Sequence, residues 1–218
     1  MSMDVVVAGG HGQVGLRLLA LLAGRGARAR GLIRTPEQAA DLEAVGAEPV
    51  VADLESADLF EAVGRADAIV FAAGAGPGSG IPRKWTLDFG GAARLVEVAK
   101  VNGIDRYVMV SAIGADRPAR SGDETFRAYL EAKATADAAL LASGLAATVL
   151  RPGGLTNDPG TGQVDLAPQL GRSGQVTRDD VAATLVALLE EWGTSGLTLE
   201  LLSGTVPIVD AVRAVAGQ

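Results

Sequence analysis

DVVVAGGHGQVG, residues 4–15, is the stretch that decides the fold. Its apolar start has the β-branched residues of a buried strand, and a leucine-rich helical pattern follows it. The glycines between them satisfy both Gly-x-x-Gly-x-x-Gly and Gly-x-Gly-x-x-Gly. Glycine permits a tight turn and lets the backbone approach a pyrophosphate, whose charge then faces a helix N-terminus. The stretch therefore predicts a dinucleotide-binding turn, against the alternative of an ordinary tight turn. Its residues are Gly9, Gly10, His11, Gly12, Gln13, Val14 and Gly15.

Short apolar runs alternate with helical segments along the rest of the chain, which predicts repeated βαβ units. The expected strands are Asp4–Ala8, Arg28–Ile33, Glu48–Val51, Ala68–Ala72, Tyr107–Ser111, Thr148–Leu150 and Thr198–Leu202. Several are apolar throughout, as in a parallel sheet covered on both faces. We expect one Rossmann-type domain over residues 1–218, an α/β fold with a doubly wound, mostly parallel sheet of about seven strands. Long loops at 74–83, 114–123 and 153–175 follow strands and are expected to form the substrate pocket.

Composition narrows the classes of function. The chain has no cysteine and one histidine, so we predict no metal site and no thiol chemistry. No apolar run approaches the ~20 residues of a membrane span, and no signal peptide is evident, so we expect a cytoplasmic protein without a membrane partner. A formal charge of -7 disfavours nucleic acid. The expected partner is a small-molecule substrate, and the protein is expected to be a monomer or a homodimer.

The second strand indicates which dinucleotide binds. An acidic residue about 20 positions after the turn favours NAD(H), whereas a basic residue suits a 2′-phosphate. Here the strand ends at Arg34, whose guanidinium can bind a phosphate, so NADP(H) is predicted over NAD(H), unless Arg34 only caps the strand. Asp53 follows the third strand near the expected adenine, although it could also cap a helix. Further cofactor contacts are expected from Ala52, Leu54, Ala72, Ala73 and Gly74.

Tyr129 and Lys133 form Tyr-x-x-x-Lys on a predicted helix over Glu124–Leu141. The four-residue spacing puts both side chains on one face. A neighbouring ammonium and an oxidised nicotinamide would lower the phenol pKa from its usual value of about 10, so Tyr129 could act as the acid in a reduction. Ser111, at the end of its strand, could donate to a substrate carbonyl. Alternatively, the tyrosine packs, the lysine binds only ribose and the serine caps a loop.

Together these motifs resemble an atypical short-chain dehydrogenase/reductase, of the small bacterial group often described as NAD(P)-binding or NAD-dependent epimerase/dehydratase proteins. The likeness covers almost the whole chain and includes residues 110–112, 150–156, 159–162 and 177–182. It implies Lys133 on the nicotinamide ribose and Pro152 and Gly153 near the nicotinamide. Relatives vary at the serine and tyrosine positions. The chain is expected to lack the C-terminal substrate domain of sugar-nucleotide epimerases, which disfavours a bulky nucleotide-sugar substrate.

The predicted function is an NADP(H)-dependent oxidoreductase that reduces a small, mostly apolar carbonyl compound, with Ser111, Tyr129 and Lys133 as the catalytic set. The alternatives are an NADPH-dependent flavin reductase and a non-catalytic NADP(H)-sensing regulator. Arg28, Arg30 and the Arg117–Arg120 loop have no assigned role, and a solvated surface is expected for these arginines. Trp85 and Trp192 are expected to pack.

Overall fold

The structure, a computed structural model, describes residues 3–76, 78–117 and 123–217. The strands are β1 (Asp4–Ala8), β2 (Arg28–Ile33), β3 (Glu48–Val51), β4 (Ala68–Phe71), β5 (Arg106–Val110), β6 (Ala146–Pro152), β7 (Gly154–Thr156), β8 (Gln163–Ala167), β9 (Gln175–Thr177), β10 (Thr198–Ser203) and β11 (Val206–Pro207). The helical elements are α1 (Gln13–Gly24), η1 (Pro36–Gln38), α2 (Ala39–Ala44), α3 (Leu59–Val63), α4 (Ile81–Arg83), the π-helical η2 (Lys84–Gly91), α5 (Ala92–Asn102), α6 (Glu124–Leu141), α7 (Arg178–Glu190), η3 (Trp192–Thr194) and α8 (Ile208–Ala216).

The central sheet confirms the Rossmann-type prediction, with strands in the order β11-β8-β10-β6-β5-β4-β1-β2-β3. Every pair from β10 to β3 is parallel, whereas β8 runs antiparallel to both β10 and β11. The described part of the chain thus gives nine strands in this sheet, where the sequence predicted about seven. The two additional strands are β8, within the stretch 153–175 that was expected to be a loop, and β11. The strands β7 and β9 form a separate two-stranded sheet.

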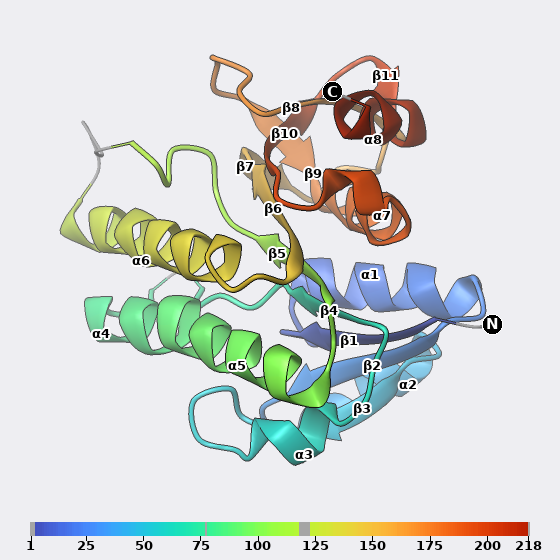
Figure 1. Ribbon diagram of the computed structural model, residues 1–218, viewed down its shortest axis with the longest axis vertical. Helices are drawn as coiled ribbons and strands as arrows, with labels where there is room; N and C mark the ends of the chain where they lie inside the picture. Colours follow the sequence, from blue (N-terminus) through green and yellow to red (C-terminus); the bar gives the residue numbers. More distant parts are fainter. Residues whose placement is uncertain (1–2, 77, 118–122, 218) are drawn as a thin grey trace.

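Helices cover both faces of the sheet (Figure 1). One apolar cluster joins α1, α2, α7 and α8 to one face, and a second joins α3, α5 and α6 to the other. Because both faces are covered, the central strands are buried on both sides, as their continuous apolar sequence predicts. The polar residues of the candidate site lie at the carboxyl ends of the strands, where the loops begin.

Three arginines, Arg106, Arg151 and Arg30, are buried, which contradicts the expected solvated surface for Arg30. Its side chain is 6% exposed, pairs with Asp4 at 2.9 Å and donates to the carbonyl oxygens of Val63 and Arg65. Arg106 is fully buried. The sequence does not reveal the contacts of these arginines, because the partner residues lie on distant segments of the chain.

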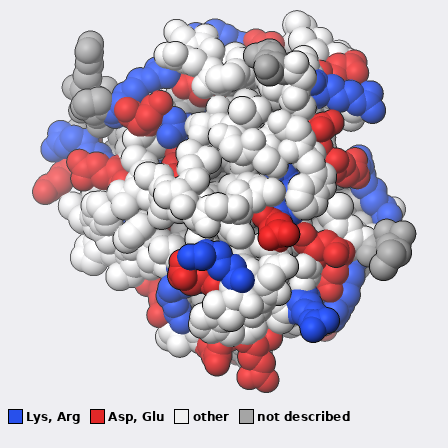
Figure 2. All heavy atoms as spheres, viewed as in Figure 1, with Lys and Arg blue, Asp and Glu red and all other residues white. Residues whose placement is uncertain are grey.

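The surface carries mixed charge. Figure 2 shows cationic and anionic side chains interspersed on the face viewed, with no extended positive area. Arg28 lies on this kind of surface and pairs with Asp4 and Glu48, as expected. Arg117 bonds the buried Glu200 at 2.7 Å, while Arg120 lies outside the described residues. Among the described helices, none combines the length and the apolar character needed to cross a membrane.

The two tryptophans are only partly packed. Trp85 is 37% exposed and contacts Phe89 edge to face, with ring centroids 6.2 Å apart. Trp192 is 54% exposed, and its ring lies 5.9 Å from the guanidinium of Arg106. The expected packing role therefore holds for one side of each ring.

Candidate functional site

The glycine turn is built from close backbone contacts. Gly9 has φ +82°, and a Cβ there would lie 2.7 Å from the backbone of Ala73. A Cβ on Gly10 would lie 2.8 Å from Gly31 on β2, and one on Gly15 would lie 2.2 Å from the carbonyl oxygen of Gly9. The absence of a side chain at these three glycines therefore lets the turn pack closely against the segment after β4, against β2 and against the start of α1.

The N-terminus of α1 is open. No side chain caps it and no acidic residue lies in its first turn. Gly12 is the N-cap, and a Cβ on it would contact only the carbonyl oxygen of Gly9, at 3.1 Å. Uncapped helix N–H groups with no competing carboxylate favour an anion. The turn therefore fits the pyrophosphate of a dinucleotide.

Gly15→Ala tests this turn. We expect the free energy of unfolding to fall by about 1–3 kcal/mol and NADPH affinity to fall with it, because the new methyl group pushes α1 away from Gly9. Urea unfolding and a fluorescence titration with NADPH measure the two effects. The control is Gly24→Ala in the same helix, where a Cβ meets nothing within 4 Å and stability should hold or rise by up to about 1 kcal/mol. Equal results for the two variants would contradict the packing argument.

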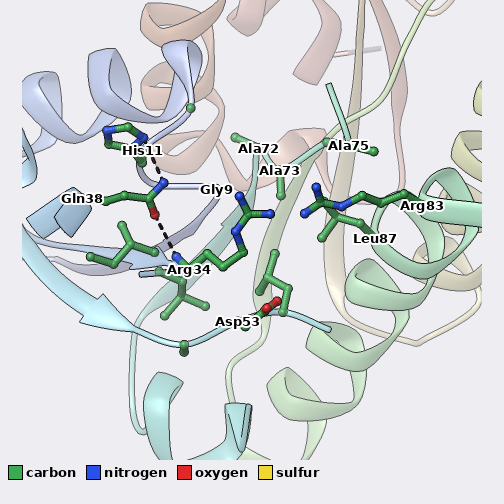
Figure 3. A pocket seen from close by; sticks show the side chains of 16 residues that line it. Gly9, His11, Arg34, Gln38, Asp53, Ala72, Ala73, Ala75, Arg83 and Leu87 are labelled. Atoms are coloured by element: carbon green, nitrogen blue, oxygen red, sulfur yellow. Dashed lines mark hydrogen bonds between the residues drawn. The ribbon is translucent and has the colours of Figure 1, made fainter. Parts of the chain in front are cut away.

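A cavity of about 340 Å³ extends from this turn over the ends of β2, β3 and β4. Arg34 and Arg83 direct their guanidinium groups into it from opposite sides (Figure 3). Arg83 also pairs with Glu55 at 3.3 Å. Two cations facing one space suit a phosphate. The predicted residues on its wall are Gly9, His11, Gly12, Arg34, Ala52, Asp53, Leu54, Ala72, Ala73 and Gly74.

Gln38 fixes the end of β2 against the glycine turn. Its side-chain oxygen accepts from the backbone N–H of Arg34 at 3.0 Å, and its nitrogen lies 3.2 Å from Nδ1 of His11. The other imidazole nitrogen is 2.7 Å from a carboxylate oxygen of Asp41. The histidine is therefore a link between the turn and α2, which the sequence did not reveal.

Asp53 has a local role beside the cavity. Its Oδ1 accepts the backbone N–H of Glu55 at 2.9 Å, so it caps a turn. The cap of α3 is Asp58 instead, which accepts from Phe60. The alternative interpretation of Asp53 as a helix cap is therefore wrong for α3, although it still lines the cavity.

A second cavity, of about 520 Å³, shares residues 72–75 with the first and lies over the ends of β4, β5 and β6. The predicted residues that line it are Val14, Ser111, Tyr129, Lys133, Pro152 and Gly153. Gly10, Gln13 and Gly15 line neither cavity. The three long loops contribute unequally: the described walls include several residues of 74–83, two of 153–175 and Asp123 of 114–123, whose residues 118–122, like residue 77, lie outside the described chain.

Lys133 is held in a buried ion pair. Its Nζ lies 3.4 Å from Oδ1 of Asp88 and donates to the carbonyl oxygens of Val110 at 3.1 Å and Ala73 at 3.4 Å. Asp88 is fully buried and accepts the N–H of Ala75. Burial lowers the pKa of Lys133, and the carboxylate of Asp88 opposes that shift. Asp88 was missed, although a lone acid within the apolar run 85–91 was a signal.

Ser111 faces a second buried carboxylate. Its hydroxyl donates to Oδ2 of Asp137 at 2.9 Å, and Nε of Arg151 donates to the same oxygen at 3.0 Å. Asp137 is four residues beyond Lys133, on the same face of α6. Burial raises the pKa of Asp137, while Arg151 lowers it. In this structure the single hydroxyl proton of Ser111 is directed to Asp137.

Tyr129 is half-buried, and the expected fall in its pKa is wrong for the chain itself. Burial raises the pKa, and Asp88 and Asp137 raise it further. Lys133 lies 5.9 Å from the ring centroid, but the paired Asp88 offsets its charge. The phenol is therefore protonated at neutral pH.

The chain is similar to known proteins over most of its length. The profile of a family described as NAD(P)H-binding matches residues 9–191. The uncharacterized sugar epimerase YhfK of Bacillus subtilis is 42% identical over 214 residues, which are 97% of this chain and 99% of that protein.

Two solved structures extend the likeness. A "Putative NAD-dependent epimerase/dehydratase" from Bacillus halodurans has 38% identity and a TM-score of 0.93, covering 98% of this chain and all of that one (100%). The oxidoreductase ylbE from Lactococcus lactis has 25% identity and a TM-score of 0.86, covering 99% and 98% of the two chains. Both alignments span nearly the full length of this chain.

Proposed function

We propose that this chain, which belongs to the NAD(P)H-binding family, is an NADP(H)-dependent reductase of small carbonyl compounds. One observation carries the proposal. Tyr129, Lys133 and Ser111 line one cavity, and that cavity adjoins the groove that runs from the glycine turn. A proton donor thus lies beside the place where a dinucleotide would end.

The cofactor contacts are divided between the two cavities. The open N-terminus of α1 would hold the pyrophosphate, and Arg34 and Arg83 would hold the adenosine 2′-phosphate. When bound, the nicotinamide supplies a hydride to the substrate. Lys133 would bind the nicotinamide ribose, and Pro152 and Gly153 would line its ring.

The remaining chemistry belongs to the side chains. Tyr129 holds a proton at Oη and donates it to the carbonyl oxygen as the bond is reduced. Its raised pKa keeps the phenol protonated, which favours reduction over oxidation. Asp88 fixes Lys133 in place, and Asp137 accepts the Ser111 hydroxyl proton, which has to turn toward the cavity to reach a substrate carbonyl.

The test is NADPH oxidation by the purified protein with separate panels of aldehydes, ketones and quinones, and with FMN. We expect turnover with at least one carbonyl class. Turnover with FMN alone would replace the proposal with flavin reduction, because a flavin can take its proton from solvent and needs no donor at Tyr129. Absence of all turnover, with clearly different affinities for NADP⁺ and NADPH, would indicate a sensor.

Arg34→Leu tests the choice of dinucleotide. We expect NADPH affinity to fall roughly ten- to a hundredfold, with NADH affinity unchanged, because only NADPH carries the 2′-phosphate. Calorimetric titration with both dinucleotides measures this. The control is Arg28→Leu at the other end of β2, which faces solvent. A parallel loss of both affinities would mean that Arg34 supports the fold and does not read the phosphate.

A further inference from the structure

Lys84 is a buried lysine with no role in the reaction described above. It is the first residue of η2, its side chain is 7% exposed, and it lines the same cavity as Tyr129. Its Nζ lies 5.5 Å from the centroid of the Tyr129 ring. A cation therefore sits in the substrate cavity, next to the proposed proton donor.

The charge of Lys84 is not neutralised within the described chain. Its Nζ donates to the carbonyl oxygen of Gly76 at 2.9 Å, and no described carboxylate forms an ion pair with it. The other two lysines differ: Lys133 pairs with Asp88 and Lys100 with Glu97. An ammonium has three donors, and within the described part of the chain one of those on Lys84 is hydrogen-bonded.

Burying a cation in this way is unfavourable unless an anion compensates it. The surrounding walls are largely apolar, with Phe126, Leu155 and Val14 among them. The nearby Asp88 is engaged by Lys133, and Asp123 is exposed and accepts the N–H of Phe126 at 2.7 Å. A ligand that carries an anionic group could therefore supply the counter-charge that Lys84 lacks.

We infer that the cavity takes a carbonyl compound that carries a carboxylate, and that Lys84 binds this carboxylate. The inference rests on the proposed reductase function and names its substrate class. A phosphate fits less well, because the other lysine of this cavity, Lys133, is already paired with Asp88, and the N-terminus of α6 is closed by the carboxylate of Asp123. A mostly apolar cavity of about 520 Å³ suits an aromatic or aliphatic body for such an acid.

The experiment is calorimetric binding of benzoate and of benzamide, with and without NADP⁺. We expect benzoate to bind at least about tenfold more tightly than benzamide. Lys84→Met should weaken benzoate binding roughly ten- to a hundredfold and leave benzamide unchanged. Lys100→Met, which removes a half-exposed lysine on α5, is the control and should change neither value.

Equal binding of benzoate and benzamide to the unaltered protein would overturn the inference, as would benzoate binding that survives Lys84→Met. The first comparison needs no variant, so a folding defect cannot mask it. Thermal unfolding and NADPH binding show whether the variant is intact. Lys84-dependent benzoate binding without any NADPH oxidation would uphold the subsite and reject the reductase function, so the two failures are distinguishable.

Discussion

Tyr129→Phe should lower kcat for carbonyl reduction by about 10²–10⁴-fold while NADPH affinity stays nearly unchanged. The hydroxyl that is lost is the proposed proton donor, and the ring that remains still fills the space between Lys84 and Lys133. Stopped-flow NADPH oxidation and a separate binding titration measure the two quantities. Unchanged turnover would remove Tyr129 from the chemistry.

The chain provides a matched control in its second tyrosine. Tyr107 is fully buried in β5, and its hydroxyl has no hydrogen-bond partner in the described structure. Tyr107→Phe removes the same atom from a place where it contributes no bond, so stability should hold or rise slightly and turnover should not change. A comparable loss of kcat in both variants would point to a general disturbance of the fold.

Arg106→Met should lower the free energy of unfolding by about 3–5 kcal/mol. The guanidinium donates to the carbonyl oxygen of Ala146 at 2.9 Å and to that of Leu188 at the end of α7. It also bonds the hydroxyl groups of Thr148 at 3.0 Å and Thr194 at 3.1 Å. Methionine fills much of the volume but makes none of these hydrogen bonds. Chemical denaturation followed by circular dichroism measures the change.

Arg25→Met is the control for a lost arginine near the same helix end. Arg25 is half-exposed and pairs with Glu190 on α7 at 3.1 Å. A surface pair contributes little, so we expect a change within about 0.5 kcal/mol. Similar losses for the two variants would mean that burial of Arg106 is not what stabilises this corner.

The local parts of the fold could be predicted from the sequence. Strands β1, β2 and β3 and helix α6 begin and end at the predicted residues. Each is fixed by a nearby signal, such as the glycine turn after β1 or the cap Asp123 before α6. The fold class follows because alternation of short strands and helices leaves few other arrangements.

The parts that depend on distant segments could not be predicted. Asp88 and Lys133 are far apart in the sequence, and their contact requires η2 to pack against α6. Ser111 and Asp137 are likewise joined only by folding. Such pairs carry no periodicity and no motif. The sequence therefore shows two ordinary acids where the structure has two buried carboxylates whose charges help to raise the pKa of Tyr129.

The two edges of the nine-stranded sheet bear on how the protein behaves at high concentration. β3 and β11 are its outermost strands, and each contains a proline, Pro49 and Pro207. Proline has no N–H to offer an approaching strand, so neither edge is a good template for adding another chain. Growth of a continuous intermolecular sheet is therefore disfavoured at both ends.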